Sequence, residues 1–143
     1  METNTRALTR TLITGSVSYV HDDDTVRDAA ECLARDNVGA LPVYDSNKHL
    51  TGIVTDRDIV VRVVARGKDA AQTKVSELAT PAPVTIGPDE PISEAVRLMS
   101  EHKVRRLPVV EGGDCIGIVS QADIARAMPP QETGKLLENI STD

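Results

Sequence analysis

The chain has 143 residues, a formal net charge of −6 and a hydrophobic fraction of 40%, and its length suits one compact domain or two small halves. Its only aromatic residues are two tyrosines, so it lacks the platforms on which single-stranded nucleic acid stacks, and its negative charge opposes nonspecific binding to nucleic acid or anionic lipid. No apolar run approaches the roughly 20 residues of a membrane span and residues 1–15 do not resemble a signal peptide, so we expect a cytoplasmic protein that binds neither membrane nor nucleic acid.

Apolar periodicity predicts the order β-α-β-β-α in the first half of the chain. A short strand at Val17–Val20 precedes a helix capped by Thr25, whose apolar residues recur at steps of three and four. Two strands, Ala40–Tyr44 and Leu50–Val54, are joined by a polar turn, and a second helix begins at Thr55.

The same order is predicted again after a polar linker at residues 67–83, in which we expect a short helix near Lys74–Ala79. The predicted elements of this half are a strand at Pro83–Ile86, a helix with Pro91 in its first turn, strands at Arg106–Val110 and Cys115–Val119, and a helix from Ser120. Pro42 and Pro108 cannot donate a ladder hydrogen bond, so they suit the beginning or the edge of a strand.

The second half of the chain repeats the first. Asn37–Asp45 falls on Lys103–Glu111 with Val, Leu, Pro and Val shared, and after a one-residue deletion GIVTDRDI, from Gly52, falls on GIVSQADI, from Gly117. This similarity indicates two copies of one supersecondary unit. We expect repeat 1 at residues 8–66, the linker at 67–83, repeat 2 at 74–128, which includes the short helix of the linker, and a polar tail at 129–143.

A motif of hydroxyl–x–x–Asp opens the last helix of both repeats, as Thr55 with Asp58 and as Ser120 with Asp123. As a structural feature it is a helix cap similar to a capping box, although Glu or Gln is the usual partner. As a site, the same helix start offers N–H groups and positive potential to a phosphate, and the carboxylate can accept hydrogen bonds from a ribose diol. The two interpretations are compatible, because one residue can do both.

The doubled pattern LPV…GIV(T/S)xxDI strongly resembles a tandem pair of cystathionine-β-synthase (CBS) domains, often called a Bateman module, over roughly residues 8–128. The chain is also similar to small stand-alone CBS-pair proteins of the hypoxic response protein type. The resemblance implies an α/β (α+β) fold of two β-α-β-β-α repeats packed about a pseudo-twofold axis. It further implies two clefts between the repeats, which bind adenine nucleotides or related adenosyl ligands in many members, and pairing of modules into a homodimer.

Charge distinguishes the two motifs. Arg105 and Arg106 precede the Leu-Pro-Val strand of repeat 2, where repeat 1 has no charged residue. The resemblance implies phosphate contacts at Arg106 and often at its predecessor, and guanidinium groups suit phosphate geometry; the alternative is a solvated basic turn in which the arginines pair with Glu101 or Glu111. Arg57, inside the first motif, could also reach a cleft. We therefore expect one nucleotide site in use, or two of different affinity.

The candidate ligand-binding residues are Thr55, Arg57, Asp58, Arg105, Arg106, Ser120 and Asp123, with Val20 and Ile86 beside the GIV strands as an apolar slot for adenine. The three histidines and two cysteines lack close ligand spacing, so no metal site is expected. Cys32 and Cys115 are interpreted as reduced thiols, with a disulfide between subunits left open.

No nucleophile elbow, phosphate-binding P-loop, zinc-protease motif or dinucleotide fingerprint occurs, so we expect no enzyme activity. Two functions remain. In the first, the protein is a ligand-sensing module that needs no cofactor, binds AMP, ADP, ATP or S-adenosylmethionine, and transmits its state to an unknown protein partner. In the second, it is a constitutive oligomerisation scaffold without bound nucleotide. The motif retained in both copies favours sensing, whereas the missing arginines of repeat 1 favour the scaffold.

Overall fold

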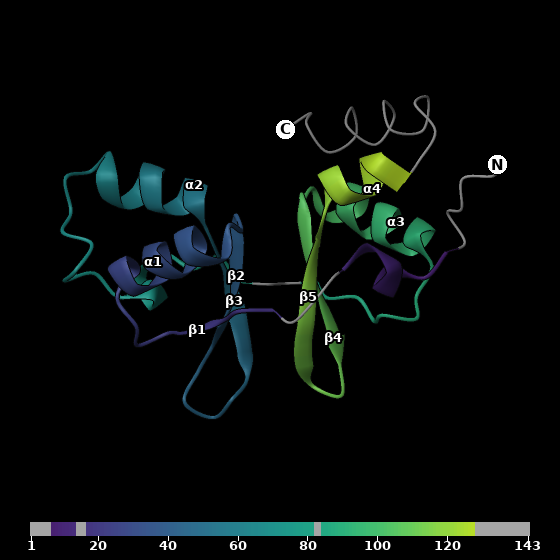
Figure 1. Cartoon of the computed structure of the whole chain (residues 1–143), viewed down its shortest axis with the longest axis horizontal. Coiled ribbons are helices and arrows are strands. Elements are labelled where there is room, and N and C mark those ends of the chain that lie inside the picture. Colours follow the sequence, from purple (N-terminus) through teal and green to yellow (C-terminus); the bar gives the residue numbers. More distant parts are fainter. Residues whose placement is uncertain (1–6, 14–16, 82–83, 128–143) are drawn as a thin grey trace. The chain divides into compact units, whose positions relative to one another are not determined.

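The computed structural model describes residues 7–13, 17–81 and 84–127, and the chain forms two compact units (Figure 1). One unit consists of residues 17–83 and the other of residues 1–16 together with 84–143. The predicted tail at 129–143 and the prolines Pro83 and Pro130 lie outside the described residues.

The unit of residues 17–83 contains β1 (Val20–His21), α1 (Val26–Asp36), β2 (Ala40–Tyr44), β3 (Leu50–Thr55), α2 (Asp56–Ile59), a π-helix (Val60–Val64) and a 3₁₀ turn (Val75–Glu77). Its sheet has the order β1-β2-β3, with β1 parallel and β3 antiparallel to β2. The first strand shares only Val20 with the predicted Val17–Val20, because the residues that pair with β2 are Val20 and His21. The other strands and both helix starts agree with the prediction.

Helix α1 begins where its sequence provides a cap and ends where the backbone turns left-handed. The Thr25 hydroxyl accepts the Asp28 N–H and the Asp28 carboxylate accepts the Thr25 N–H, both at 3.1 Å, which completes a capping box. Asn37 closes the helix at φ 53°, a conformation that asparagine tolerates. Between these ends, Val26, Ala29 and Leu33 are buried in the core of the unit.

Pro42 lies in the middle of β2, which is the central strand, rather than at a strand end. Its partner across the ladder is Ile53, whose N–H and C=O both bond to Thr80 on the far side of β3 at 2.9 Å. Pro42 and Ile53 are therefore a non-hydrogen-bonded pair, and the nitrogen of Pro42 points away from β3. β1 pairs with β2 only from Val43 onward, so Pro42 occupies a local edge, as its missing N–H requires.

The second unit contains a 3₁₀ turn (Thr9–Leu12), α3 (Ile92–His102), β4 (Arg106–Glu111), β5 (Asp114–Ser120) and α4 (Gln121–Ala127). In place of the predicted strand at Pro83–Ile86, Ile86 forms a single parallel bridge with Val109 among the described residues. Pro91 is the N-cap of α3, with φ −68° and ψ 153°, and not a first-turn residue, because helical geometry starts at Ile92. In each unit the helices pack on one side of the sheet (Figure 1).

Each unit is completed by the chain segment that precedes the other repeat in the sequence. The Val75 N–H donates to Asp24 O at 2.8 Å, and at the matching place in the second unit the Thr9 N–H donates to Glu90 O at the same distance. The predicted repeat boundaries, 8–66 and 74–128, follow the sequence repeat. The compact units instead place the 3₁₀ turn at Thr9 with the second repeat and the linker with the first. Local periodicity carries no information about this exchange, because each of these bonds joins residues that lie far apart in the sequence.

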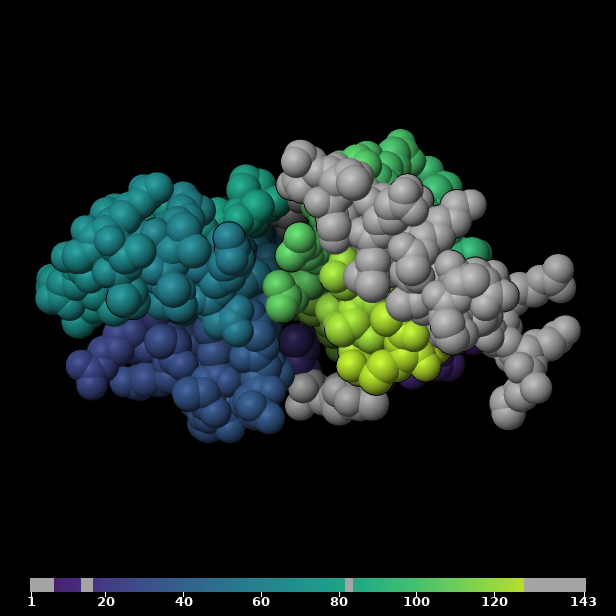
Figure 2. All heavy atoms as spheres, turned by 90° about the horizontal axis from the view of Figure 1, so that it is seen from above, coloured from purple at the N-terminus to yellow at the C-terminus, as the bar shows by residue number. Residues whose placement is uncertain are grey.

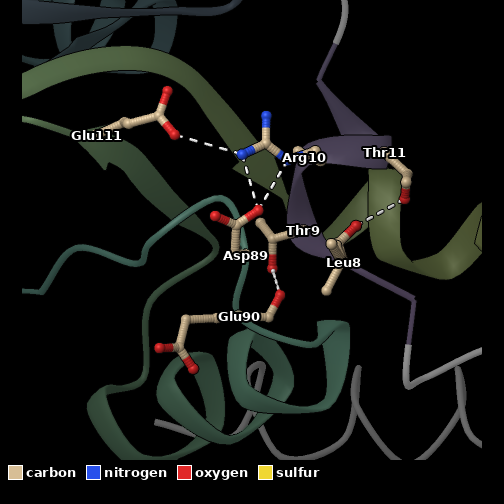
Figure 3. A network of polar contacts seen from close by, with 7 residues as sticks. All are labelled: Leu8, Thr9, Arg10, Thr11, Asp89, Glu90 and Glu111. Atoms are coloured by element: carbon tan, nitrogen blue, oxygen red, sulfur yellow. Dashed lines mark hydrogen bonds and ion pairs between the residues drawn. The ribbon is translucent and has the colours of Figure 1, made fainter.

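Polar contacts hold the N-terminal turn on the second unit (Figure 3). The Arg10 guanidinium donates to Asp89 Oδ1 at 2.7 and 2.9 Å and to Glu111 Oε2 at 3.3 Å, and the Thr9 hydroxyl donates to Glu90 O at 2.8 Å. Gly117 of β5 fits against this segment, since a Cβ there would lie 2.7 Å from Ile13 Cγ2.

Candidate functional site

The first hydroxyl–x–x–Asp motif joins β3 to α2 and forms a complete capping box. The Thr55 hydroxyl accepts the Asp58 N–H at 3.1 Å, and Asp58 Oδ2 accepts the Thr55 N–H at 2.9 Å. Asp58 Oδ1 has no hydrogen bond or ion pair to any residue in the described part of the chain. The cap interpretation is confirmed here, and one carboxylate oxygen is still available for a ligand.

The second motif repeats this geometry between β5 and α4. The Ser120 hydroxyl accepts the Asp123 N–H at 3.1 Å, and Asp123 Oδ2 accepts the Ser120 N–H at 2.9 Å. Here the other oxygen is engaged, because Arg126 Nη2 donates to Asp123 Oδ1 at 2.5 Å. The spacing of three residues on a helix could have indicated this pair, but the sequence analysis missed it.

The arginines lie beside the second motif, as the sequence predicts. Arg106 is the cross-strand partner of Ser120, and the Gln121 N–H donates to Arg105 O at 2.9 Å. In the first unit, Ala40 is the cross-strand partner of Thr55, and the Asp56 N–H donates to Gly39 O at 3.0 Å. The two motifs therefore share their caps and differ in the charge beside them.

Arg105 and Arg106 do not form the alternative ion pairs with Glu101 or Glu111. Glu101 accepts from Arg97 at 2.5 Å, and Glu111 accepts from Arg10 at 3.3 Å. Neither the guanidinium of Arg105 nor that of Arg106 has an ion pair within residues 7–13, 17–81 and 84–127. Arg105 is exposed and Arg106 half-buried, so both can turn toward an anion without breaking an internal salt bridge.

The remaining predicted residues divide into one surface and two core positions. Arg57 is exposed on α2, and its side chain has no partner in the described ranges. Val20 and Ile86 are each 4% exposed and belong to the hydrophobic cores of their own units. Their role as an adenine slot stays a prediction, and both residues have a structural role already.

Gln121, the residue after Ser120, was not predicted from the sequence. Its Oε1 is the one buried side-chain oxygen or nitrogen without a hydrogen-bond partner among the residues that the structure describes. A buried acceptor left unpaired costs about 1–3 kcal/mol, so a donor from a ligand or water would be favourable there. No sequence signal distinguishes it, since glutamine at a helix start is usually exposed.

Neither cysteine forms a disulfide in the structure, both are buried, and burial raises the pKa of the Cys32 and Cys115 thiols. No three His, Cys, Asp or Glu side chains are grouped to hold a metal ion within the described residues. The helices of that same part of the chain include none that is long and apolar enough to cross a membrane.

Comparison with known proteins shows the family of the chain. The family model of the CBS domain matches residues 10–65 and again residues 75–130. The chain belongs to the CBS-domain family. A CBS domain-containing protein of Bacillus subtilis, YhcV, is 38% identical over 130 residues, which are 90% of this chain and 91% of YhcV. Hypoxic response protein 1 of Mycobacterium tuberculosis is 36% identical over 120 residues, 84% of each chain.

Solved structures of CBS pairs have the same fold. The crystal structure of Hypoxic Response Protein I with two coordinated zinc ions has a TM-score of 0.72 at 35% identity and covers 86% of this chain and 100% of its own. The CBS pair of protein MJ0100 in complex with 5′-methylthioadenosine and S-adenosyl-L-methionine has a TM-score of 0.72 at 28% identity, covering 84% and 98%. The predictions of a tandem pair of CBS domains, of similarity to the hypoxic response protein type and of an α+β fold are confirmed.

Proposed function

We propose that this CBS-pair protein is a non-catalytic regulatory module that binds an adenosyl ligand at its hydroxyl–x–x–Asp motifs and passes its ligand state to a protein partner. The observation that carries the proposal is the second motif, where Ser120 and Asp123 lie beside Arg105 and Arg106, two arginines whose guanidinium groups form no ion pair with any residue that the structure describes. The MJ0100 pair, which binds two adenosyl compounds, supports the choice of ligand class.

Each group of the motif suits one part of such a ligand. A carboxylate oxygen can accept the hydrogen bonds of a ribose diol, as it does in dinucleotide sites. Guanidinium groups bind phosphate oxygens through charge-assisted, often bidentate, hydrogen bonds. Arg105 and Arg106 supply these next to the second motif, so we propose that a phosphate-bearing nucleotide such as AMP, ADP or ATP binds there more tightly than S-adenosylmethionine. The first motif, with Asp58 and only Arg57 beside it, suits an adenosyl ligand without phosphates.

A thermal-shift series with AMP, ADP, ATP, S-adenosylmethionine and NAD tests the proposal. Ligand at about 100 times its Kd stabilises the folded protein by about 2.7 kcal/mol, which raises the melting temperature measurably. Asp58→Asn and Asp123→Asn keep a side-chain oxygen for the cap but remove the carboxylate, so each should lose the shift due to its own motif. An unchanged shift in the double variant would mean that the motifs are caps and nothing more.

The second candidate is a constitutive scaffold, favoured by Gly39 and Ala40, the uncharged residues of the first unit at the places that Arg105 and Arg106 occupy in the second. A scaffold predicts no shift with any of these ligands and an oligomeric mass that ligand does not change. Homodimer formation and a cytoplasmic location stay predictions. Sedimentation with and without ligand measures homodimer formation.

A further inference from the structure

The two motifs have the same capping hydrogen bonds, so the other contacts of their carboxylates can be compared directly. In both, the Asp Oδ2 accepts the N–H of the hydroxyl residue at 2.9 Å, and the hydroxyl accepts the Asp N–H at 3.1 Å. Any difference in how Asp58 and Asp123 receive a ligand therefore comes from their second oxygen and its neighbours, and not from the cap.

The second oxygen is occupied in one motif only. Asp123 Oδ1 accepts from Arg126 Nη2 at 2.5 Å, and the Arg126 and Asp123 side chains are 72% and 24% exposed. The residue at the same place after Asp58 is Val61, which is 43% exposed and cannot donate. Helix α4 forms part of the visible surface in Figure 2 (yellow-green). Because the Arg126 side chain is mostly exposed, it can leave the pair without unpacking the core.

Because Asp123 Oδ2 already accepts the Ser120 N–H, the proposed function directs the ribose diol to Oδ1, the oxygen that Arg126 now uses. The hydroxyl group of the ligand must therefore either displace the arginine from the carboxylate or share the carboxylate oxygen with it. Exposed ion pairs at this helical spacing are weak and are screened by salt. The expected effect on binding is therefore modest, about two- to fivefold, and it depends on ionic strength.

We propose that Arg126 sets the affinity of the second motif by competing with the sugar of the ligand for Asp123, and that Val61 leaves the first motif without such a competitor. This inference rests on the proposed function, because it assumes that the motif receives a ribose. It assigns to Arg126 and Val61 a difference in affinity for the sugar, separate from the phosphate preference proposed for Arg105 and Arg106.

The test is calorimetric titration with adenosine, which carries the diol and no charge. Each motif is isolated by removing the other carboxylate: Asp58→Asn leaves the second motif, and Asp123→Asn leaves the first. In the Asp58→Asn background, Arg126→Gln should tighten adenosine binding about two- to fivefold. In the Asp123→Asn background, Val61→Arg should weaken binding at the first motif. Arg97→Gln, which removes the same charge from a pair on α3, should change neither.

Salt gives an independent readout. Adenosine should bind the Asp58→Asn protein more tightly as ionic strength rises, because screening weakens the Arg126–Asp123 pair, and Arg126→Gln should abolish that dependence. If Arg126→Gln leaves adenosine affinity unchanged or lowers it, while Asp123→Asn still removes one site from the wild type, the competition is overturned and the proposed function stands. If adenosyl ligands bind none of these proteins, Arg126→Gln included, both are overturned.

Discussion

Arg106 and Ser120 are directly opposite each other in the ladder between β4 and β5. This register brings a cation, a hydroxyl group and the start of α4 to one place, although the two residues stand at opposite ends of the hairpin sequence. The corresponding pair in the first unit is Ala40 and Thr55, so the hydroxyl group has no cation opposite it. From this difference we expect the two motifs to differ in their affinity for a phosphate-bearing ligand.

Arg106→Ala should weaken ATP binding at the second motif and affect adenosine binding much less. A hydrogen bond to a charged group is worth about 1.5–3 kcal/mol, which corresponds to roughly 10- to 150-fold in Kd. Calorimetric titration of both ligands in the Asp58→Asn background measures the difference. Arg97→Ala is the control for loss of a surface charge. Equal losses for ATP and adenosine would show that Arg106 does not contact phosphate.

Gly117→Ala should destabilise the second unit, since the new Cβ would lie 2.7 Å from Ile13 Cγ2. Overpacking of this kind typically costs about 1–3 kcal/mol, and urea denaturation measures it. Ile13→Ala should recover part of the loss in the double variant, because the obstacle is a side chain. In the first unit, Gly52→Ala meets the Thr80 carbonyl oxygen at 2.5 Å, a backbone atom that no side-chain truncation removes. Strict additivity of Gly117→Ala and Ile13→Ala would contradict the packing account.

Asp36→Asn should lower the melting temperature at neutral pH but not near pH 2. Hydrogen bonds from Arg35 and Ser18 lower the pKa of Asp36 to about 2 in the folded protein, against about 3.9 in an unfolded chain. The unfolded state therefore binds the proton first, so the stabilisation is present above pH 4 and is lost as the pH falls toward 2.

Melting curves of the wild type and Asp36→Asn between pH 7 and pH 2 check this dependence. Asp114→Asn, which removes a carboxylate for which the described residues provide no ion pair, is the control. A difference in melting temperature that stays constant over the whole range would rule out a lowered pKa at Asp36.

Gln121→Met should raise the free energy of unfolding of the ligand-free protein. It removes the buried Oε1 that has no donor among the described residues and keeps a side chain of similar length that favours helix. We expect a gain of about 1 kcal/mol, measured by urea denaturation. If a ligand donor satisfies Oε1, the same variant binds that ligand more weakly. A destabilised Gln121→Met protein would mean that water already satisfies the amide.

Local patterns were enough to predict most of the fold. The apolar spacing of Val26 to Leu33 and the Thr25 cap predicted α1, and the doubled Leu-Pro-Val and Gly-Ile-Val segments predicted the β2–β3 and β4–β5 pairs. The exchange of segments that joins Thr9 to Glu90 could not be predicted, because its bonds connect residues 81 positions apart and follow no periodic pattern.

The sequence was enough to predict which residues belong to the candidate site, but not which charged side chains pair with each other. The repeat identified Thr55, Asp58, Ser120 and Asp123, and these residues form the two capping boxes. Which cation pairs with which carboxylate depends on side-chain reach in three dimensions. The sequence could not decide that Glu111 is bound by Arg10, which lies in the N-terminal turn 101 residues away. Arg106 and Glu111 themselves stand at the two ends of β4, so the strand keeps them apart.

The most direct test of ligand binding at the motifs is a backbone-amide NMR titration of the full chain with ATP and with S-adenosylmethionine. We predict that the largest chemical-shift changes occur at residues 120–123 and 105–106 with ATP, and at residues 55–58 with S-adenosylmethionine. Changes confined to other surfaces, or a spectrum that neither ligand alters, would contradict the assignment of these motifs as the binding sites.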